Sequence, residues 1–151
     1  MTGRWLDDLE GRIKHGEGGR FFLVEAPLRY EDRAGDVWTM PAGFRCDLAS
    51  VPRLLLPIAA LLLPWHRSAR AGVLHDYLYL RGLVPRSRAD ALFREALIAD
   101  DPANGSAACW SMWLAVRAGG WRAWRLYRHH GARRREWMRS RATLSSDPAD
   151  L

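Results

Sequence analysis

The chain has 151 residues, 48% of them hydrophobic, which suits a single domain with one core of ordinary size. Its formal net charge of +6 makes an acidic partner more suitable than a basic one. The two cysteines, Cys46 and Cys109, have no metal-binding spacing, so the sequence supports neither a disulfide framework nor a zinc site. A reducing compartment fits this cysteine usage.

Two parts of the sequence are candidates for a signal peptide or a membrane-spanning helix. The amino-terminal residues are charged and glycine-rich, and they lack the apolar stretch of a signal peptide. No run reaches the roughly 20 apolar residues that a membrane-spanning helix needs. The most apolar run, residues 54–65, is interrupted by Pro57 and Pro64 and is interpreted as part of the core. We therefore expect neither a signal peptide nor a transmembrane segment.

The first third of the chain is predicted to form short strands after a flexible lead-in. We interpret residues 1–19 as that lead-in, with a short helix from Trp5 to Ile13. The β-prone runs that follow lie at residues 21–24, 28–30 and 37–40. Their spacing indicates a small antiparallel meander.

Helices are predicted for the rest of the chain. Apolar residues recur at helical spacing from Ser68 to Leu80 and from Arg88 to Ala99, and a long helix is expected from Ser106 to about Arg139. Strands followed by helices favour an α+β fold in which three to four helices pack on one side of the sheet. We place one domain at residues 20–121 and interpret residues 122–151 as a basic helical arm with a frayed tail.

Two short motifs carry the residues that are most suited to chemistry. The first is Gly43-Phe-Arg-Cys-Asp-Leu-Ala-Ser-Val-Pro52, in the proline-rich segment, and the second is His75-Asp-Tyr-Leu-Tyr79, on a predicted helix. Two polar groups near a core cost about 1–3 kcal/mol each if they have no partners. His75 and Tyr79 share one helix face, and Asp76 lies about 100° round from His75. These side chains therefore need partners from other elements.

These motifs resemble those of a phage- and prophage-associated family, domain-of-unknown-function family 1353. Its members carry G-F-x-T-D-L-A-S-V-P, then H-D-x-L-Y, then a segment like Ala89-Asp90-Ala-Leu-Phe93, and the resemblance extends over residues 21–121. Cys46 stands where the family usually has threonine. The resemblance implies a viral or prophage origin, in the bacterial host cytoplasm or in the virus particle, and assigns no activity.

The second motif also resembles the phospholipase A-two arrangement, which implies a role for each residue. By that likeness His75 would be the general base for water, Asp90 would orient the imidazole, and Tyr79 would hold Asp90. Asp76 would bind a divalent metal, calcium rather than zinc, and the loop that carries Asp47 would complete the six to eight oxygen ligands. A weaker likeness connects the His-Asp pair with metal phosphohydrolases of the HD type, whose all-helical core conflicts with the predicted strands.

Each of these residues also has a structural interpretation. Ser87 and Asp90 have the spacing of a capping box at the start of a helix. Asp47 would form a local turn, and His75 would be a core histidine bonded to Asp90 or to a backbone carbonyl. The function is therefore either a small metal-dependent hydrolase or a non-enzymatic virion, tail or morphogenesis component. In the second case a basic arm would dock on a partner.

The carboxy-terminal helix combines tryptophans with arginines, which suits a membrane surface, nucleic acid phosphates or a viral structural protein. Trp110, Trp113 and Trp121 occur at helical spacings and are expected to pack on the domain. From Trp124 onward the helix is expected to be exposed. No small-molecule cofactor is expected.

Overall fold

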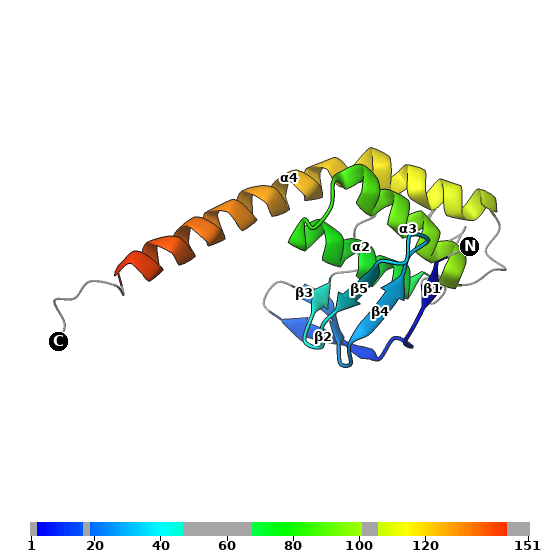
Figure 1. The fold of residues 1–151 in the computed structure, drawn as a ribbon, viewed down its shortest axis with the longest axis horizontal. Coiled ribbons are helices and arrows are strands. Elements are labelled where there is room, and N and C mark those ends of the chain that lie inside the picture. The colour runs from blue at the N-terminus through cyan, green and yellow to red at the C-terminus, as the bar shows by residue number, and fades with distance from the viewer. Residues whose placement is uncertain (1–2, 17–18, 47–67, 101–105, 145–151) are drawn as a thin grey trace.

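The computed structural model describes residues 3–16, 19–46, 68–100 and 106–144, and the apolar run at 54–65 and the loop with Asp47 lie outside them. In these described ranges six strands form two antiparallel sheets of three strands each, and three helices follow (Figure 1). The predicted α+β fold is confirmed. Within the described residues, no helix has both the length and the apolar character needed to cross a bilayer.

The first sheet has the order β1-β4-β5. Its strands are β1 (Arg4–Trp5), β4 (Leu28–Glu31) and β5 (Val37–Met40). Leu28 and Tyr30 are fully buried, whereas Arg29 between them is exposed, as expected for a strand with one face on the core. Glycine at position 35, with a φ of 88°, permits the turn between β4 and β5.

The second sheet has the order β2-β3-β6. Its strands are β2 (Gly11–Gly16), β3 (Gly19–Val24) and β6 (Arg45–Cys46). The three runs expected to form one meander are therefore divided, because β3 pairs with β2 and β6 while β4 and β5 form a hairpin in the other sheet.

The predicted helix from Trp5 to Ile13 is wrong. Trp5 pairs with Tyr30 of β4, and Ile13 pairs with Phe22 of β3, so this segment contributes one strand to each sheet. Backbone pairing with distant strands overrides a weak local helical pattern. Ile13 is half-exposed at the sheet surface, so it does not belong to a buried helical stripe.

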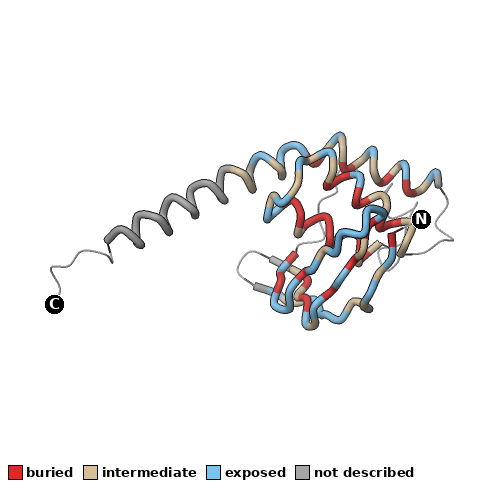
Figure 2. The backbone as a smooth tube through the Cα atoms, in the orientation of Figure 1, coloured by how far each residue is buried: buried red, intermediate tan, exposed pale blue. Residues whose placement is uncertain are grey.

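The three helices lie on one side of the strands (Figure 1). They are α2 (Ala69–Arg81), α3 (Arg86–Asp100) and α4 (Ser106–Leu144), close to the predicted bounds. Gly82 ends α2 in the left-handed conformation with a φ of 62°, and its N–H donates to the Leu78 carbonyl. Helix α4 crosses the far side of α2 and α3 and extends beyond them (Figures 1 and 2).

The core contains buried residues from both sheets and from all three helices. Figure 2 marks the buried residues along the backbone. From α2, α3 and α4 the core includes Leu74, Leu78, Leu92, Leu97 and Val116. Burial of these leucine and valine side chains stabilises the fold by roughly 25 cal/mol for each Å² of apolar area removed from water. This packing holds the face of α2 that carries the second motif against α3.

The buried face of α4 differs from the prediction. Trp110 and Trp121 are 47% and 43% exposed, whereas Trp124 packs on the core and its ring meets Tyr79 edge-on at 5.0 Å between centroids. The expectation that Trp110 and Trp121 pack inward and Trp124 outward is therefore wrong. Cys109, Met112 and Val116 set the inner face.

Candidate functional site

Helices α2 and α3 bring His75, Tyr79 and Asp90 together. His75 and Tyr79 lie one turn apart on α2, and Asp90 faces them from α3. His75 Nε2 is 3.0 Å from Asp90 Oδ1, and the Tyr79 hydroxyl donates to the same oxygen at 2.5 Å. The helical spacing of the second motif predicts the shared face of His75 and Tyr79. The contacts of both residues with Asp90 are expected from the phospholipase A-two likeness.

Two arginines complete the surroundings of Asp90. Arg117 of α4 donates through Nη1 to Asp90 Oδ2 at 2.8 Å, and Arg86 Nε lies 3.7 Å from the same oxygen. Arg86 also donates to the Tyr79 hydroxyl at 3.2 Å and to the backbone carbonyls of Val116 and Arg117. Asp90 thus joins α2, α3 and α4 through charge-assisted hydrogen bonds.

The His75 and Asp90 side chains are enclosed. Their side chains are 1% and 0% exposed. The rings of Tyr79 and Phe93 lie 4.0 and 4.9 Å from the imidazole, between centroids. A buried carboxylate of this kind needs compensating partners. His75, Tyr79 and Arg117 supply hydrogen bonds, and Arg86 supplies a nearby positive charge.

The capping-box interpretation of Asp90 is wrong. Helix α3 begins at Arg86, so Ser87 lies inside its first turn, and the N–H groups of Arg88 and Ala89 donate to the Pro85 carbonyl. The Asp90 carboxylate accepts from His75, Tyr79 and Arg117 instead. A capping side chain would have to turn back to its own helix start.

The charges of the site follow from burial and from these bonds. Burial opposes ionisation of Asp90, but the hydrogen bonds from His75, Tyr79 and Arg117 together hold its pKa below the usual range. Burial lowers the pKa of His75, although the bond to Asp90 acts in the opposite direction. The pair at neutral pH is therefore an ionised carboxylate beside a neutral imidazole.

The neutral imidazole has one defined tautomer. Because Asp90 is ionised and can only accept, we assign the ring proton to Nε2 of His75, which donates it to Oδ1. Nδ1 then carries the lone pair. Nδ1 is buried and has no hydrogen-bond partner in the part of the chain that the structure describes. The one basic nitrogen of the pair is thus held in a fixed orientation and accepts no hydrogen bond from the described residues.

Asp76 and Asp47 have different outcomes. Asp76 is 5% exposed and follows His75 on α2. Asp47 lies outside the described residues. Among the described residues, no group of three or more His, Cys, Asp or Glu side chains is placed to hold a metal.

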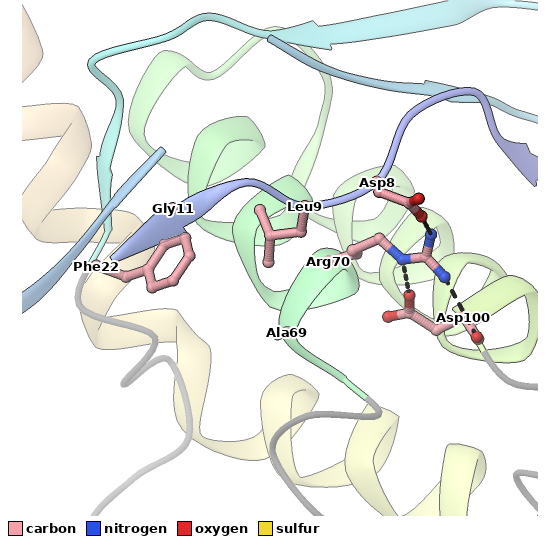
Figure 3. Close-up of a pocket in the computed structure, with 7 residues that line it drawn as sticks. All are labelled: Asp8, Leu9, Gly11, Phe22, Ala69, Arg70 and Asp100. Carbon is pink, nitrogen blue, oxygen red and sulfur yellow. Dashed lines mark hydrogen bonds and ion pairs between the residues drawn. The ribbon is translucent and has the colours of Figure 1, made fainter. Parts of the chain in front are cut away.

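A separate cavity lies at the other end of α2 (Figure 3), with a volume of about 390 Å³. Arg70 crosses it, donating through Nε to Asp100 at 2.5 Å and pairing with Asp8 at 3.4 Å. Its lining residues are Asp8, Leu9, Gly11, Phe22, Ala69, Arg70 and Asp100. None of the predicted site residues within the described ranges lines it, and its cation is already paired.

Arg86 and Arg117 are the site residues that sequence reasoning missed. Arg86 precedes Asp90 by one helical turn, so its pairing was visible as an i,i+4 spacing of opposite charges. Arg117 is 27 residues from Asp90 and is one of many arginines in its helix. Only the docking of α4 distinguishes it from the others.

The fold and site define an α+β domain whose helices enclose a hydrogen-bonded histidine–aspartate pair. The chain belongs to a family of proteins of unknown function, DUF1353, whose sequence model matches residues 22–116. The matched span runs from β3 into α4 and includes His75, Tyr79 and Asp90. No curated protein and no solved structure gives a significant match.

Proposed function

We propose that this protein is a small hydrolase in which His75 activates water for attack on an ester. The observation that carries the proposal is the His75 imidazole, bonded through Nε2 to Asp90 while its buried Nδ1 has no partner in the described residues. A purely structural histidine would be expected to satisfy both nitrogens, because a buried unsatisfied polar atom costs about 1–3 kcal/mol. The phospholipase A-two likeness of the second motif supports the same roles.

The proposed reaction begins with one water molecule bonded to Nδ1 of His75. This nitrogen takes a proton as the water oxygen bonds to the ester carbonyl carbon, and Asp90 stabilises the imidazolium that forms. The tetrahedral intermediate collapses, the bond to the alcohol oxygen breaks, and the imidazolium returns its proton to the departing oxygen. Asp90 stays ionised throughout, since Arg117, Arg86 and Tyr79 hold its charge.

The residues described for this chain do not complete a divalent metal site. Calcium takes six to eight oxygen ligands, and of the two predicted ligands only Asp76 lies within the described ranges. No step of the proposed reaction is therefore assigned to a metal ion. Binding of calcium by Asp76 and Asp47 stays a prediction that an assay with and without the ion can test.

The test compares ester hydrolysis by the full-length wild type with that by His75→Asn and Asp90→Asn. Substrates would be nitrophenyl esters of increasing chain length and a fluorogenic phospholipid, each with calcium or with a chelator. We expect a loss of at least about 100-fold for His75→Asn, as general bases contribute roughly 10²–10⁴-fold. His15→Asn, at an exposed position of β2, is the matched control and should be fully active. Equal rates for wild type and His75→Asn in folded samples would exclude the proposal.

A non-enzymatic role as a virion, tail or morphogenesis component is the second candidate. It is favoured by the four side chains from three helices that surround Asp90. Such a network is sufficient to explain the His75–Asp90 pair as a structural contact that holds the helices together. Fractionation of phage-producing cells tests it, because a virion component would sediment with intact particles and a host-cytoplasmic enzyme would stay in the soluble fraction. Particle association without hydrolysis would favour this second role.

A further inference from the structure

The outer face of α4 carries large apolar side chains that the domain leaves in solvent. Trp110, Leu114 and Trp121 are 47%, 57% and 43% exposed, and Ala118 between them is also exposed. At about 100° per residue these positions fall within an arc of roughly 80° on one side of the helix. The buried residues of α4 lie on the other side, against α2 and α3 (Figure 2). We call this stripe the outer face of α4.

Arginines surround the exposed tryptophans. Arg94 of α3 places its guanidinium carbon 4.1 Å from the centre of the Trp110 ring. Arg122 and Arg125 place theirs 5.5 and 5.1 Å from the centre of Trp121. The sequence of α4 contains no acidic residue before Glu136. The outer face is therefore apolar along its centre, cationic at its margins and free of negative charge from its own helix.

We propose that the outer face of α4 docks on an anionic lipid bilayer. Tryptophan and leucine enter the boundary between headgroups and acyl chains, and arginines beside them pair with lipid phosphates. Helix α4 lies on the opposite side of the domain from the sheets, so the sheets do not cover its outer face (Figure 1). The charge of the face matches an anionic surface.

The observations favour a bilayer over single-stranded nucleic acid or a second copy of the chain. Base stacking needs open aromatic faces, whereas Arg94 already covers Trp110 and two arginines flank Trp121. Leu114 and Ala118 offer no hydrogen bonds to bases. Two outer faces brought together would place like charges opposite each other, which disfavours self-association.

Co-flotation of the full-length protein with vesicles tests the proposal. The vesicles would be phosphatidylcholine alone or an equimolar mixture with phosphatidylglycerol. We expect binding to the anionic vesicles that weakens as the salt concentration rises from ~0.1 to ~1 M, since the screening length falls from about 10 to about 3 Å. The readout is binding and not turnover, so the result is independent of the proposed hydrolysis.

Two double variants distinguish binding through the outer face of α4 from a general effect of the protein's net charge. Arg122→Gln with Arg125→Gln should lower the partition constant about 25-fold, at about fivefold for each basic residue near the surface. Arg4→Gln with Arg12→Gln, on exposed positions of β1 and β2, removes the same charge and should change binding less than about threefold. Trp110→Ser with Trp121→Ser should weaken binding to anionic vesicles at unchanged charge.

Three outcomes would overturn the proposal. The first is no binding to anionic vesicles, or equal binding to both kinds of vesicle. The second is an equal loss of binding in the two arginine double variants, which would show a net-charge effect. The third is tighter binding to a single-stranded oligonucleotide than to vesicles, with that binding lost in Trp110→Ser with Trp121→Ser, which would assign the face to nucleic acid.

Discussion

Asp90 connects the three helices through its carboxylate. Its carboxylate is fully buried and takes hydrogen bonds or ion pairs from α2, from its own helix and from α4. Removing one partner of a buried charged pair typically costs 3–5 kcal/mol, whereas an exposed pair contributes about 0–1 kcal/mol. The same bonds hold the carboxylate ionised, which fixes the tautomer of His75.

At the residue scale we predict a stability that falls in mild acid because of His75. Burial lowers its pKa in the folded protein, so between that pKa and about 6.5 the unfolded chain binds more protons than the folded one. Stability therefore rises with pH up to about 6.5 and this contribution is constant above it. The slope is at most about 1.4 kcal/mol per pH unit.

Urea denaturation at pH 8 and at pH 5 measures this effect. The wild type should lose up to about 2 kcal/mol between the two. His75→Gln removes the titrating group and should lose less, whereas His15→Gln, on the exposed surface of β2, should behave like the wild type. Identical pH dependence in His75→Gln and the wild type would contradict the prediction. Asp90 contributes only at lower pH, since its own pKa lies below the usual carboxyl range.

The sequence could predict part of this site and not the rest. His75 and Tyr79 share a helix face by spacing alone, and Asp90 is the acidic residue of the next apolar helix. A two-residue difference in where α3 begins, Arg86 instead of Arg88, separates a cap from a core carboxylate, and the sequence does not fix helix ends that closely. The contact between Arg117 and Asp90 depends on how α4 packs across the other helices. No local sequence pattern predicts that packing.

At the element scale, polar contacts connect α3 to the β4–β5 hairpin. Arg88 donates to Asp32 Oδ2 at 2.6 Å, and Trp38 Nε1 donates to the same oxygen at 3.1 Å. Glu95, two turns further along α3, accepts from the Tyr30 hydroxyl at 3.0 Å and from the backbone N–H of Arg33 at 2.8 Å. These bonds set where the helical layer lies on the first sheet.

We predict that Arg88→Met destabilises the protein by about 1–3 kcal/mol, because Asp32 has a fully buried side chain and loses its cationic partner. Arg4→Met is the matched control. It removes an ion pair with Glu31 from an exposed strand and should change stability by less than about 1 kcal/mol. The free energy of unfolding in urea measures both. Equal losses would mean that the Asp32 contact does not hold α3 on the hairpin.

Elements with strong periodicity were predictable, and elements that depend on distant pairing were not. The bounds of α2 follow from its apolar spacing and from Gly82, and β4 and β5 follow from alternation. The two-residue strands β1 and β6 exist only because β4 and β3 pair with them. In α4 tryptophans occur on both faces, so their spacing alone does not select the inner one.

At the scale of the whole molecule, α4 is both part of the domain and an extension from it. Trp124 and Tyr127 pack on the core, and Arg128 lies 4.1 Å over the Trp124 ring and donates to the Gly82 carbonyl. Beyond residue 128, α4 extends past the other elements of the fold (Figure 1). The domain boundary predicted at residue 121 thus precedes residues that contact the core.

We predict that a chain ending at residue 128 keeps the stability of the full chain, with a melting temperature within about 2 °C, whereas one ending at residue 121 loses at least about 4 °C. The shorter chain lacks the Trp124 and Tyr127 contacts, and about 1 kcal/mol shifts the melting temperature of a domain this size by several degrees. Thermal unfolding of both chains measures the difference. Equal melting temperatures for the two truncations would place the boundary at 121.

The sequence separations between Asp90 and its partners indicate the order in which the helices can assemble. Tyr79 and His75 are 11 and 15 residues away, so they are available as soon as α2 and α3 meet, whereas Arg117 is 27 residues further on. A slide of α4 by one turn would move Arg117 by about 5.4 Å and leave the buried charge short of a cation. We infer that the Asp90 carboxylate sets the register in which α4 packs on α2 and α3. It thereby selects one packing position of α4 among the several that the apolar faces of this helix would allow.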